Sequence, residues 1–328
     1  MKDINMKIFD VTLPTSMNNF LNYSSTIKGK SPRTIVGYKT DLVLFFKFLK
    51  LYRGLAPQNM DFNEICISDV DDKLIATITL GDLVSFITYA ENQRDNNEHA
   101  RARKISSLRS FFKYLCDKEK TLSENPAKEL DLPKLSKKNP IYLTLDEAKS
   151  LLNAVEGKNY SRDYAILTLF LNCGLRLSEL CSIDVSRIKE DTLTVLGKGN
   201  KERTIYLNKA CLEALSTYMN HRNKLIDKID LKSKDALFIS NKMNRISQRA
   251  VERLVEKYVV KAGLDKEKYS PHKLRHTAAT LMYKHGEVDI RSIQEILGHE
   301  SISTTQIYTH LDDEQLRQAV KSNPLSKE

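Results

Sequence analysis

The sequence lacks several features that mark common protein classes. Its five cysteines are odd in number and form no CxxC pair, which argues against a disulfide framework and against a zinc site. It has no run of about 18 uninterrupted apolar residues, and its first residues, MKDINMKIFDVTLP, lack the apolar stretch of a signal peptide. We therefore expect a soluble, cytoplasmic protein that does not associate with a membrane.

A loop for nucleotide hydrolysis is missing as well. The lysine-bearing turn GKGNKER at residues 197–203 does not match the G-x-x-x-x-G-K-[ST] pattern of a Walker A loop. Internal repeats and low-complexity segments are also not evident.

The chain carries an excess of positive charge. Its 52 lysines and arginines against 42 aspartates and glutamates give a formal charge of +10. Such an excess favours a large anionic partner, and nucleic acid is the first candidate. The chain has 328 residues, of which 41% are hydrophobic, so two ordinary globular domains are expected.

Helical patterns dominate the N-terminal part. In SPRTIVGYKTDLVLFFKFLK, at residues 31–50, Ser31 is a good N-cap, Pro32 suits the first helical position, and apolar residues follow at helical spacing. Further helices are expected over residues 80–89 and 98–119. The last of these has a basic surface that suits a DNA backbone, although a merely solvated face is an alternative. The basic residues predicted to bind DNA are Arg101, Arg103, Lys104 and Arg109.

A stretch rich in proline and lysine divides the chain. SENPAKELDLPKLSKKNPIYLT, at residues 123–144, has little periodicity and is typical of an extended linker. The domains predicted from it are a helical DNA-binding domain over 14–122, a linker over 123–140 and a second domain over 141–328. The long segment 52–78 has an acidic patch, which we expect to point away from DNA or to contact a protein.

The second domain combines helices with a small β element. Leu193 and Val195, and then Thr204, Ile205 and Tyr206, flank the turn GKGNKER, which predicts two strands joined by a glycine-rich turn. The fold class expected is mainly α with a small β-sheet or hairpin. Helices are expected in residues 143–155, 161–183, 209–226, 247–263, 270–286 and 289–300.

Two short motifs place basic residues where a phosphate could bind. In GLRLSEL, Arg176 follows a glycine inside an otherwise apolar helix, and Glu179 could pair with it. In SPHKLRH, His272 is expected in the first helical turn and Arg275 one turn later, beside backbone amides that favour an anion. An HxxR pattern by itself is common on surface helices.

The order of the motifs is far more specific than any one of them. GLRLSEL, GKGNKER, PHKLRHTAAT and LGHESISTTQIYTH closely resemble the motifs of the tyrosine site-specific recombinases, in particular the bacterial Xer branch. The resemblance covers most of the chain, and it implies a helical core-binding domain followed by a mixed α/β catalytic domain. The catalytic residues that it implies are Arg176, Lys198, His272, Arg275, His299 and Tyr308 as the nucleophile.

The resemblance also implies a mechanism. The tyrosine would attack a DNA phosphate and hold it as a 3′-phosphotyrosyl ester, while the two arginines grip the non-bridging oxygens. Lys198 would protonate the departing 5′-oxygen, and His272 would accept the proton of the phenol. His299 would hydrogen-bond the phosphate. Because cations already surround the phosphate, no metal and no cofactor is expected. A packed aromatic is the structural alternative for Tyr308.

The expected partner is double-stranded DNA with specific recombination sites. The family works as a homo- or hetero-tetramer on paired sites, and a tail helix after Tyr308 would join neighbouring protomers, although it could instead cap its own domain. Chromosome dimer resolution, integration of a mobile element and DNA inversion would all use the same catalytic residues. A type IB topoisomerase and a non-catalytic DNA-binding regulator are further alternatives.

Overall fold

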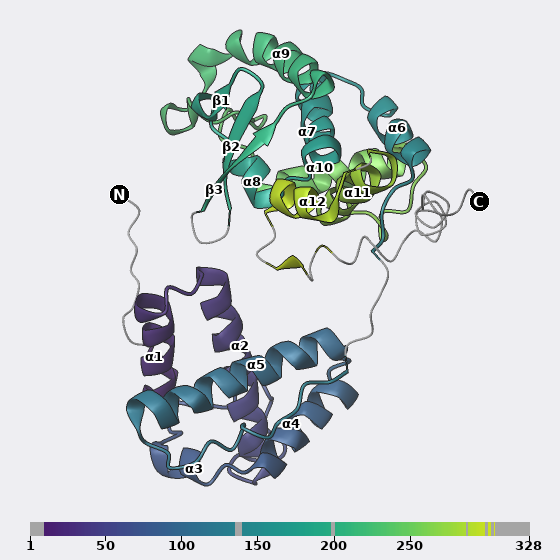
Figure 1. Ribbon diagram of the computed structural model, residues 1–328. Coiled ribbons are helices and arrows are strands. Elements are labelled where there is room, and N and C mark those ends of the chain that lie inside the picture. Colours follow the sequence, from purple (N-terminus) through teal and green to yellow (C-terminus); the bar gives the residue numbers. More distant parts are fainter. Residues whose placement is uncertain are drawn as a thin grey trace, which may run out of the picture. The chain divides into compact units, whose positions relative to one another are not determined.

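The protein forms two compact units that divide between residues 137 and 138 (Figure 1). Both are mainly helical, and the second contains a small antiparallel sheet, as the sequence predicts. The computed structural model describes residues 10–134, 140–197, 201–286, 288–298, 301–302 and 305.

The first unit is a set of helices around an aromatic core. The helix α2 (Pro32–Tyr52) begins as predicted, because Ser31 Oγ accepts a hydrogen bond from the Thr34 amide at 3.2 Å. Phe45 and Phe46 of this helix are completely buried among side chains of the neighbouring helices. The other helices are α1 (Thr15–Asn22), α3 (Asp72–Ala76), α4 (Leu80–Asn92) and α5 (Glu98–Tyr114), with π-helical turns at Tyr23–Ile27 and Leu115–Glu119.

The acidic segment 52–78 is part of this core. Its Ile67 and Val70 are buried in the same cluster as the phenylalanines. Asp69 forms an ion pair of 2.7 Å with Lys50 of α2, and Asp71 caps α3 by accepting a hydrogen bond from a backbone amide. Two of the acidic residues of this segment, Asp69 and Asp71, therefore hold it in place.

The start of the predicted linker packs on the first unit. Ala127 and Leu130 are buried in its core, so residues 123–130 are not an extended tether. The sequence prediction missed this because prolines dominate the local pattern and only two apolar side chains anchor the segment.

The second unit is organised around one buried helix. The helix α7 (Tyr160–Cys173) packs against α9 (Lys209–Asn223) and α11 (Pro271–His285). An apolar helix contacted from several sides is the expected centre of a domain core. The remaining helices are α6 (Leu145–Asn153), α8 (Leu177–Ser182), α10 (Gln248–Lys261) and α12 (Ile290–Leu297), with 3₁₀ turns at Val185–Arg187, Ile226–Lys228 and Leu231–Ser233.

The sheet has the strand order β1-β2-β3. The strands β2 (Thr192–Leu196) and β3 (Glu202–Tyr206) form the predicted hairpin, in which Val195 pairs with Arg203. The additional strand β1 (Ile188–Lys189) was not predicted, since two residues are too short to show an alternating pattern. No helix in the described part of the chain has both the length and the apolar character needed to cross a bilayer.

Candidate active site

A buried carboxylate lies at the centre of the basic cluster in the second unit. Glu179, in the first turn of α8, is 2% exposed. Its Oε1 accepts hydrogen bonds from Arg176 Nη1 at 2.7 Å and from Arg203 Nη1 at 2.6 Å. Its Oε2 accepts from Arg203 Nη2 at 2.8 Å and from the Arg176 amide at 2.8 Å. Burial by itself would raise the pKa of Glu179, but the bonds from Arg203 and Arg176 outweigh it and lower the pKa to about 2.

Arg275, on α11, belongs to the same cluster although it is distant from Glu179 in the sequence. It is 3% exposed, and its Nη1 lies 3.8 Å from Glu179 Oε2. Nη1 also donates to the Gly174 carbonyl at 2.7 Å, and Nη2 donates to the Leu297 carbonyl at 2.6 Å. A buried guanidinium with this many acceptors is held in one orientation.

The C-terminal end of α12 joins the three arginines. Its last carbonyls accept hydrogen bonds from all of them: Ile296 from Arg203 Nε at 3.2 Å, Leu297 from Arg275, and Gly298 from Arg176 Nη2 at 2.9 Å. Carbonyls at a helix C-terminus lack partners within the helix and carry partial negative charge. This end of α12 (yellow in Figure 1) therefore stabilises a group of like charges that would otherwise repel one another.

Two glycines allow this close approach. Gly174 ends α7 with φ +57°, and a Cβ there would lie 2.6 Å from Leu297 Cδ2. Gly298 ends α12 with φ +64°, and a Cβ there would lie 2.9 Å from Arg203 Cδ.

The break at Gly174 corrects the predicted position of Arg176, which does not lie inside a helix but is the N-cap residue of α8. A left-handed residue ended the helix earlier than the apolar pattern indicated.

His272 lies in the first turn of α11, as predicted, and is exposed at the surface. Its Nε2 is 3.1 Å from Nε2 of His276, one turn further along the helix. Partial desolvation, together with the nearby charges of Lys273, Arg275 and Arg176, lowers the pKa of His272 below its ordinary value of 6.5. The lowered pKa favours the neutral form of the ring, which can accept a proton.

Three of the six predicted catalytic residues belong to the described structure. It brings Arg176 and Arg275 to the same helix end and places His272 one turn before Arg275 on α11. Lys198, His299 and Tyr308 lie outside the described residues. Among the described side chains, no group of three or more His, Cys, Asp or Glu residues could hold a metal ion.

Sequence reasoning missed Arg203. The motif GKGNKER predicts a turn, but its last two residues, Glu202 and Arg203, already belong to β3. Strand side chains alternate between faces, so Arg203 must share a face with the buried Ile205. That spacing was the available signal that this arginine points inward.

The basic residues of α5 differ in their surroundings. Lys104 is only 5% exposed and lies 3.4 Å from the buried carboxylate of Asp41, so its predicted place on the DNA-binding surface is wrong. Arg103 binds the same Asp41 at 2.6 Å, but half of its side chain is exposed. Arg101 is paired with Glu91. Arg109 is partly buried.

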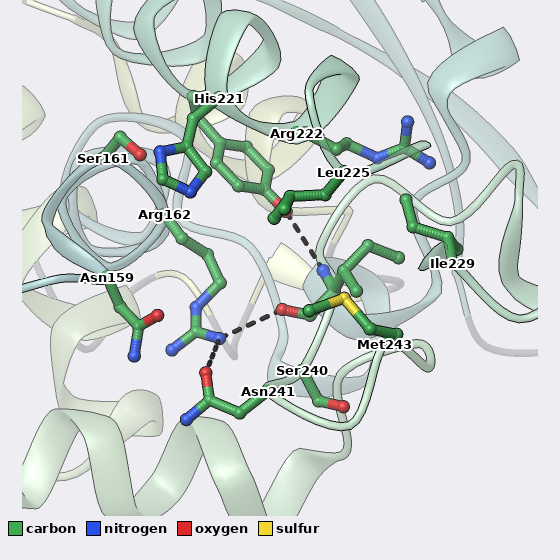
Figure 2. Close-up of a pocket in the computed structure, with 12 residues that line it drawn as sticks. Asn159, Ser161, Arg162, His221, Arg222, Leu225, Ile229, Ser240, Asn241 and Met243 are labelled. Carbon is green, nitrogen blue, oxygen red and sulfur yellow. Dashed lines mark hydrogen bonds between the residues drawn. The ribbon is translucent and has the colours of Figure 1, made fainter. Parts of the chain in front are cut away.

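A separate pocket of about 50 Å³ opens beside the N-terminus of α7 (Figure 2). Arg162 is one of its lining residues, and Figure 2 shows its guanidinium bound to the Ile239 carbonyl and to Asn241 Oδ1. Arg162 also pairs with Asp163 at 2.8 Å. These bonds join α7 to the loop at residues 239–241, so this arginine stabilises the fold of that loop.

The model of the phage integrase family matches residues 142–315, which is more than half of the chain. The chain belongs to the phage integrase family. A tyrosine recombinase XerC of Caldanaerobacter subterraneus subsp. tengcongensis is 56% identical over 315 residues, covering 96% of this chain and 88% of the relative. A tyrosine recombinase XerC of Thermodesulfovibrio yellowstonii is 39% identical, covering 95% of this chain and 97% of that relative. The protein is therefore a Xer-like site-specific tyrosine recombinase, an enzyme that transfers DNA strands.

Solved recombinase structures have the same fold. The XerH site-specific recombinase bound to a palindromic difH substrate aligns with a TM-score of 0.69 and 22% identity, covering 93% of this chain and 84% of that one. A lambda integrase dimer bound to a COC′ core site aligns with a TM-score of 0.61 and 18% identity, covering 88% of this chain and 95% of that one. The two-domain recombinase architecture expected from the motifs is confirmed.

Proposed function

We propose that this recombinase cleaves DNA with Tyr308 and uses the cluster around Glu179 to bind the scissile phosphate. The observation that supports this most directly is the convergence of Arg176 and Arg275, about 100 residues apart in sequence, on the end of α12. A guanidinium can donate two parallel hydrogen bonds to phosphate oxygens. Two such groups would stabilise the negative charge that gathers on the non-bridging oxygens in the transition state.

The proposed step conserves the energy of the phosphodiester. The oxygen of Tyr308 forms a bond to phosphorus as the bond to the 5′-oxygen breaks. The proton of the phenol passes to the neutral ring of His272, and the 5′-oxygen takes a proton from Lys198. His299 donates a hydrogen bond to the phosphate. Attack of a 5′-hydroxyl on the phosphotyrosyl ester reverses the step, so no nucleotide is consumed.

The test is capture of covalent protein–DNA adducts from the source cell under denaturing conditions, followed by sequencing of the attached DNA. Adducts from the parent that vanish in Tyr308→Phe would support the phosphotyrosyl ester. If the two proteins gave equal adducts, another nucleophile would be at work. If the parent protein gave no adducts in the cell and also trapped none on a nicked duplex, the non-catalytic DNA-binding regulator would be favoured.

The map of the attached DNA would also identify the biological role. We propose chromosome dimer resolution in the cytoplasm as the leading role, supported by the name XerC carried by the two relatives described above. A single chromosomal site would agree with it, whereas adducts at mobile-element ends or at invertible promoters would indicate an integrase or an invertase. Relaxation of DNA without paired sites would indicate a type IB topoisomerase.

We further propose that the first unit, residues 14–122 with the segment that packs on it, binds DNA and that residues 141–328 catalyse.

The tail at residues 312–328 would dock on a neighbouring protomer in a tetramer. An apolar pocket of about 500 Å³ between β3, α11 and α12, lined in part by Ile205 and Met282, could accept it. Deleting residues 312–328 should spare binding to one site and abolish pairing of two sites, as measured by native gels. Unchanged pairing would refute this role of the tail.

A further inference from the structure

Arg203 holds groups that lie outside its own sheet. Its side chain is 13% exposed, and its two Nη atoms bind both oxygens of Glu179. Its Nε donates to the Ile296 carbonyl at the end of α12. One side chain of the hairpin is thus fastened to α8 and to α12 together.

The charges of the cluster depend on this side chain. Three guanidinium groups and one carboxylate, 3 − 1, leave two net positive charges around Glu179. Without Arg203 the same count, 2 − 1, leaves only one. Arg176, at 2.7 Å, and Arg275, at 3.8 Å, would then be the remaining cations that attract the Glu179 carboxylate. An arginine drawn to a buried carboxylate is less available to a phosphate.

Arg203 also supports the backbone that orients the other two arginines. A Cβ at Gly298 would lie 2.9 Å from Arg203 Cδ, so the arginine stem lies directly against this residue. The Gly298 carbonyl binds Arg176, and the preceding Leu297 carbonyl binds Arg275. A shift of Arg203 would therefore move the acceptors of both.

We propose that Arg203 is a positioning residue for DNA cleavage: it neutralises Glu179 and fixes the end of α12, and thereby keeps Arg176 and Arg275 aimed at the scissile phosphate. The proposal rests on the phosphate-binding role given above to these two arginines. Arg203 itself need not touch DNA.

The test compares two DNAs that differ only in the charge of one group. Each is a nicked duplex carrying a cleavage site mapped by the adduct sequencing, with either an ordinary scissile phosphate or a methylphosphonate, in which a methyl group replaces one charged oxygen. A neutral phosphonate needs less neutralisation by arginine. The rate of covalent adduct formation by the full-length protein is measured under single-turnover conditions on both.

We expect Arg203→Gln to form adducts with ordinary DNA on the order of a hundredfold more slowly, the loss typical of misplaced catalytic groups. On the methylphosphonate its loss should shrink to within a few-fold, while DNA affinity stays close to that of the parent. The melting temperature should fall, because the buried carboxylate of Glu179 loses a partner, so both rates are measured below the melting temperature of the variant. Arg187→Gln is the matched control, since Arg187 pairs with the adjacent Glu202 at 2.6 Å on the surface. It should leave both rates unchanged.

A purely structural role of Arg203 would lower both rates equally, and that result, or an undiminished rate on ordinary DNA, would overturn the proposal. Arg203→Lys, which keeps the charge but cannot bind both carboxylate oxygens, is measured by the same comparison in case the glutamine variant does not fold. Arg275→Ala tests the phosphate-binding role separately from the positioning role of Arg203. If its loss does not shrink on the methylphosphonate, the phosphate-binding role fails; if it shrinks and that of Arg203→Gln does not, only the role of Arg203 fails.

Discussion

His272 is surrounded by cations that favour its neutral form. Desolvation, Lys273, Arg275 and Arg176 all lower its pKa from 6.5. If the ring accepts the proton of the phenol, cleavage should have a constant rate at neutral pH and slow only below pH 6.5, as the ring becomes protonated. A pH profile of single-turnover cleavage measures this. In His272→Gln the slope should disappear, and a slope that persists would assign the titration to another group.

Glu179 has the opposite linkage to pH. Its pKa falls from 4.5 in the unfolded chain to about 2 in the fold, so the stability that it contributes is present above pH 4.5 and is lost as the pH falls towards 2. The difference corresponds to roughly 3 kcal/mol. Glu179→Gln should therefore be less stable than the parent at pH 7, and the gap between their melting temperatures should narrow below pH 4.5. A gap that stays constant with pH would contradict this.

At this scale the sequence predicted the positions of the motif residues better than it predicted their partners. Arg176, His272 and Arg275 stand in short motifs that can be recognised locally. The partnership of Arg176 with Glu179 was expected because three residues separate them. The Gly298 carbonyl, which binds Arg176 at the end of α12, is more than 100 residues from Arg176 in the sequence. No local pattern encodes such a pairing.

At the scale of elements, the contact between α7 and α12 depends on Gly174. An alanine there would adopt a left-handed conformation and meet Leu297 Cδ2 at 2.6 Å. Gly263 also has a positive φ, of +74°, but has no atom within 4 Å of an added Cβ, so it is the matched control. We expect Gly263→Ala to cost about 1 kcal/mol of unfolding free energy from backbone strain alone. Gly174→Ala should cost roughly 1–3 kcal/mol more through overpacking. Equal losses in denaturant titrations would refute the tight contact.

The face of α5 offers a second comparison between neighbours. Lys104 is buried beside Asp41, whereas Arg103 extends from the same carboxylate to the surface. Lys104→Met should therefore lower the unfolding free energy by roughly 1–3 kcal/mol, because a buried carboxylate loses a partner. Arg103→Gln should lower stability as well, because the same carboxylate loses a bond of 2.6 Å, and it alone should reduce the slope of log affinity against log salt by about 1, as expected for one phosphate contact. Denaturant titrations measure the stability of both variants, and DNA titrations at several salt concentrations measure the slope.

The elements themselves were largely predictable. Helix α2 was identified from Ser31, Pro32 and its apolar spacing, and the β2–β3 hairpin from alternation around GKGNKER. The pattern failed where few residues decide the structure, as in the two-residue strand β1. It also failed for Lys104, because helical spacing does not reveal a buried acceptor such as Asp41 on another helix.

For the whole molecule, net charge and two-unit organisation lead to a prediction about salt. The chain has a formal charge of +10, and we propose that both units contact DNA, so each phosphate neutralised by the full-length protein releases counterions. With about six such contacts, affinity should fall on the order of a thousandfold between about 50 and 200 mM salt. Fluorescence titration with the mapped duplex measures this. A protein that gripped DNA through one unit alone would make fewer phosphate contacts and give a shallower slope, and an affinity that hardly changed with salt would rule out the two-unit grip.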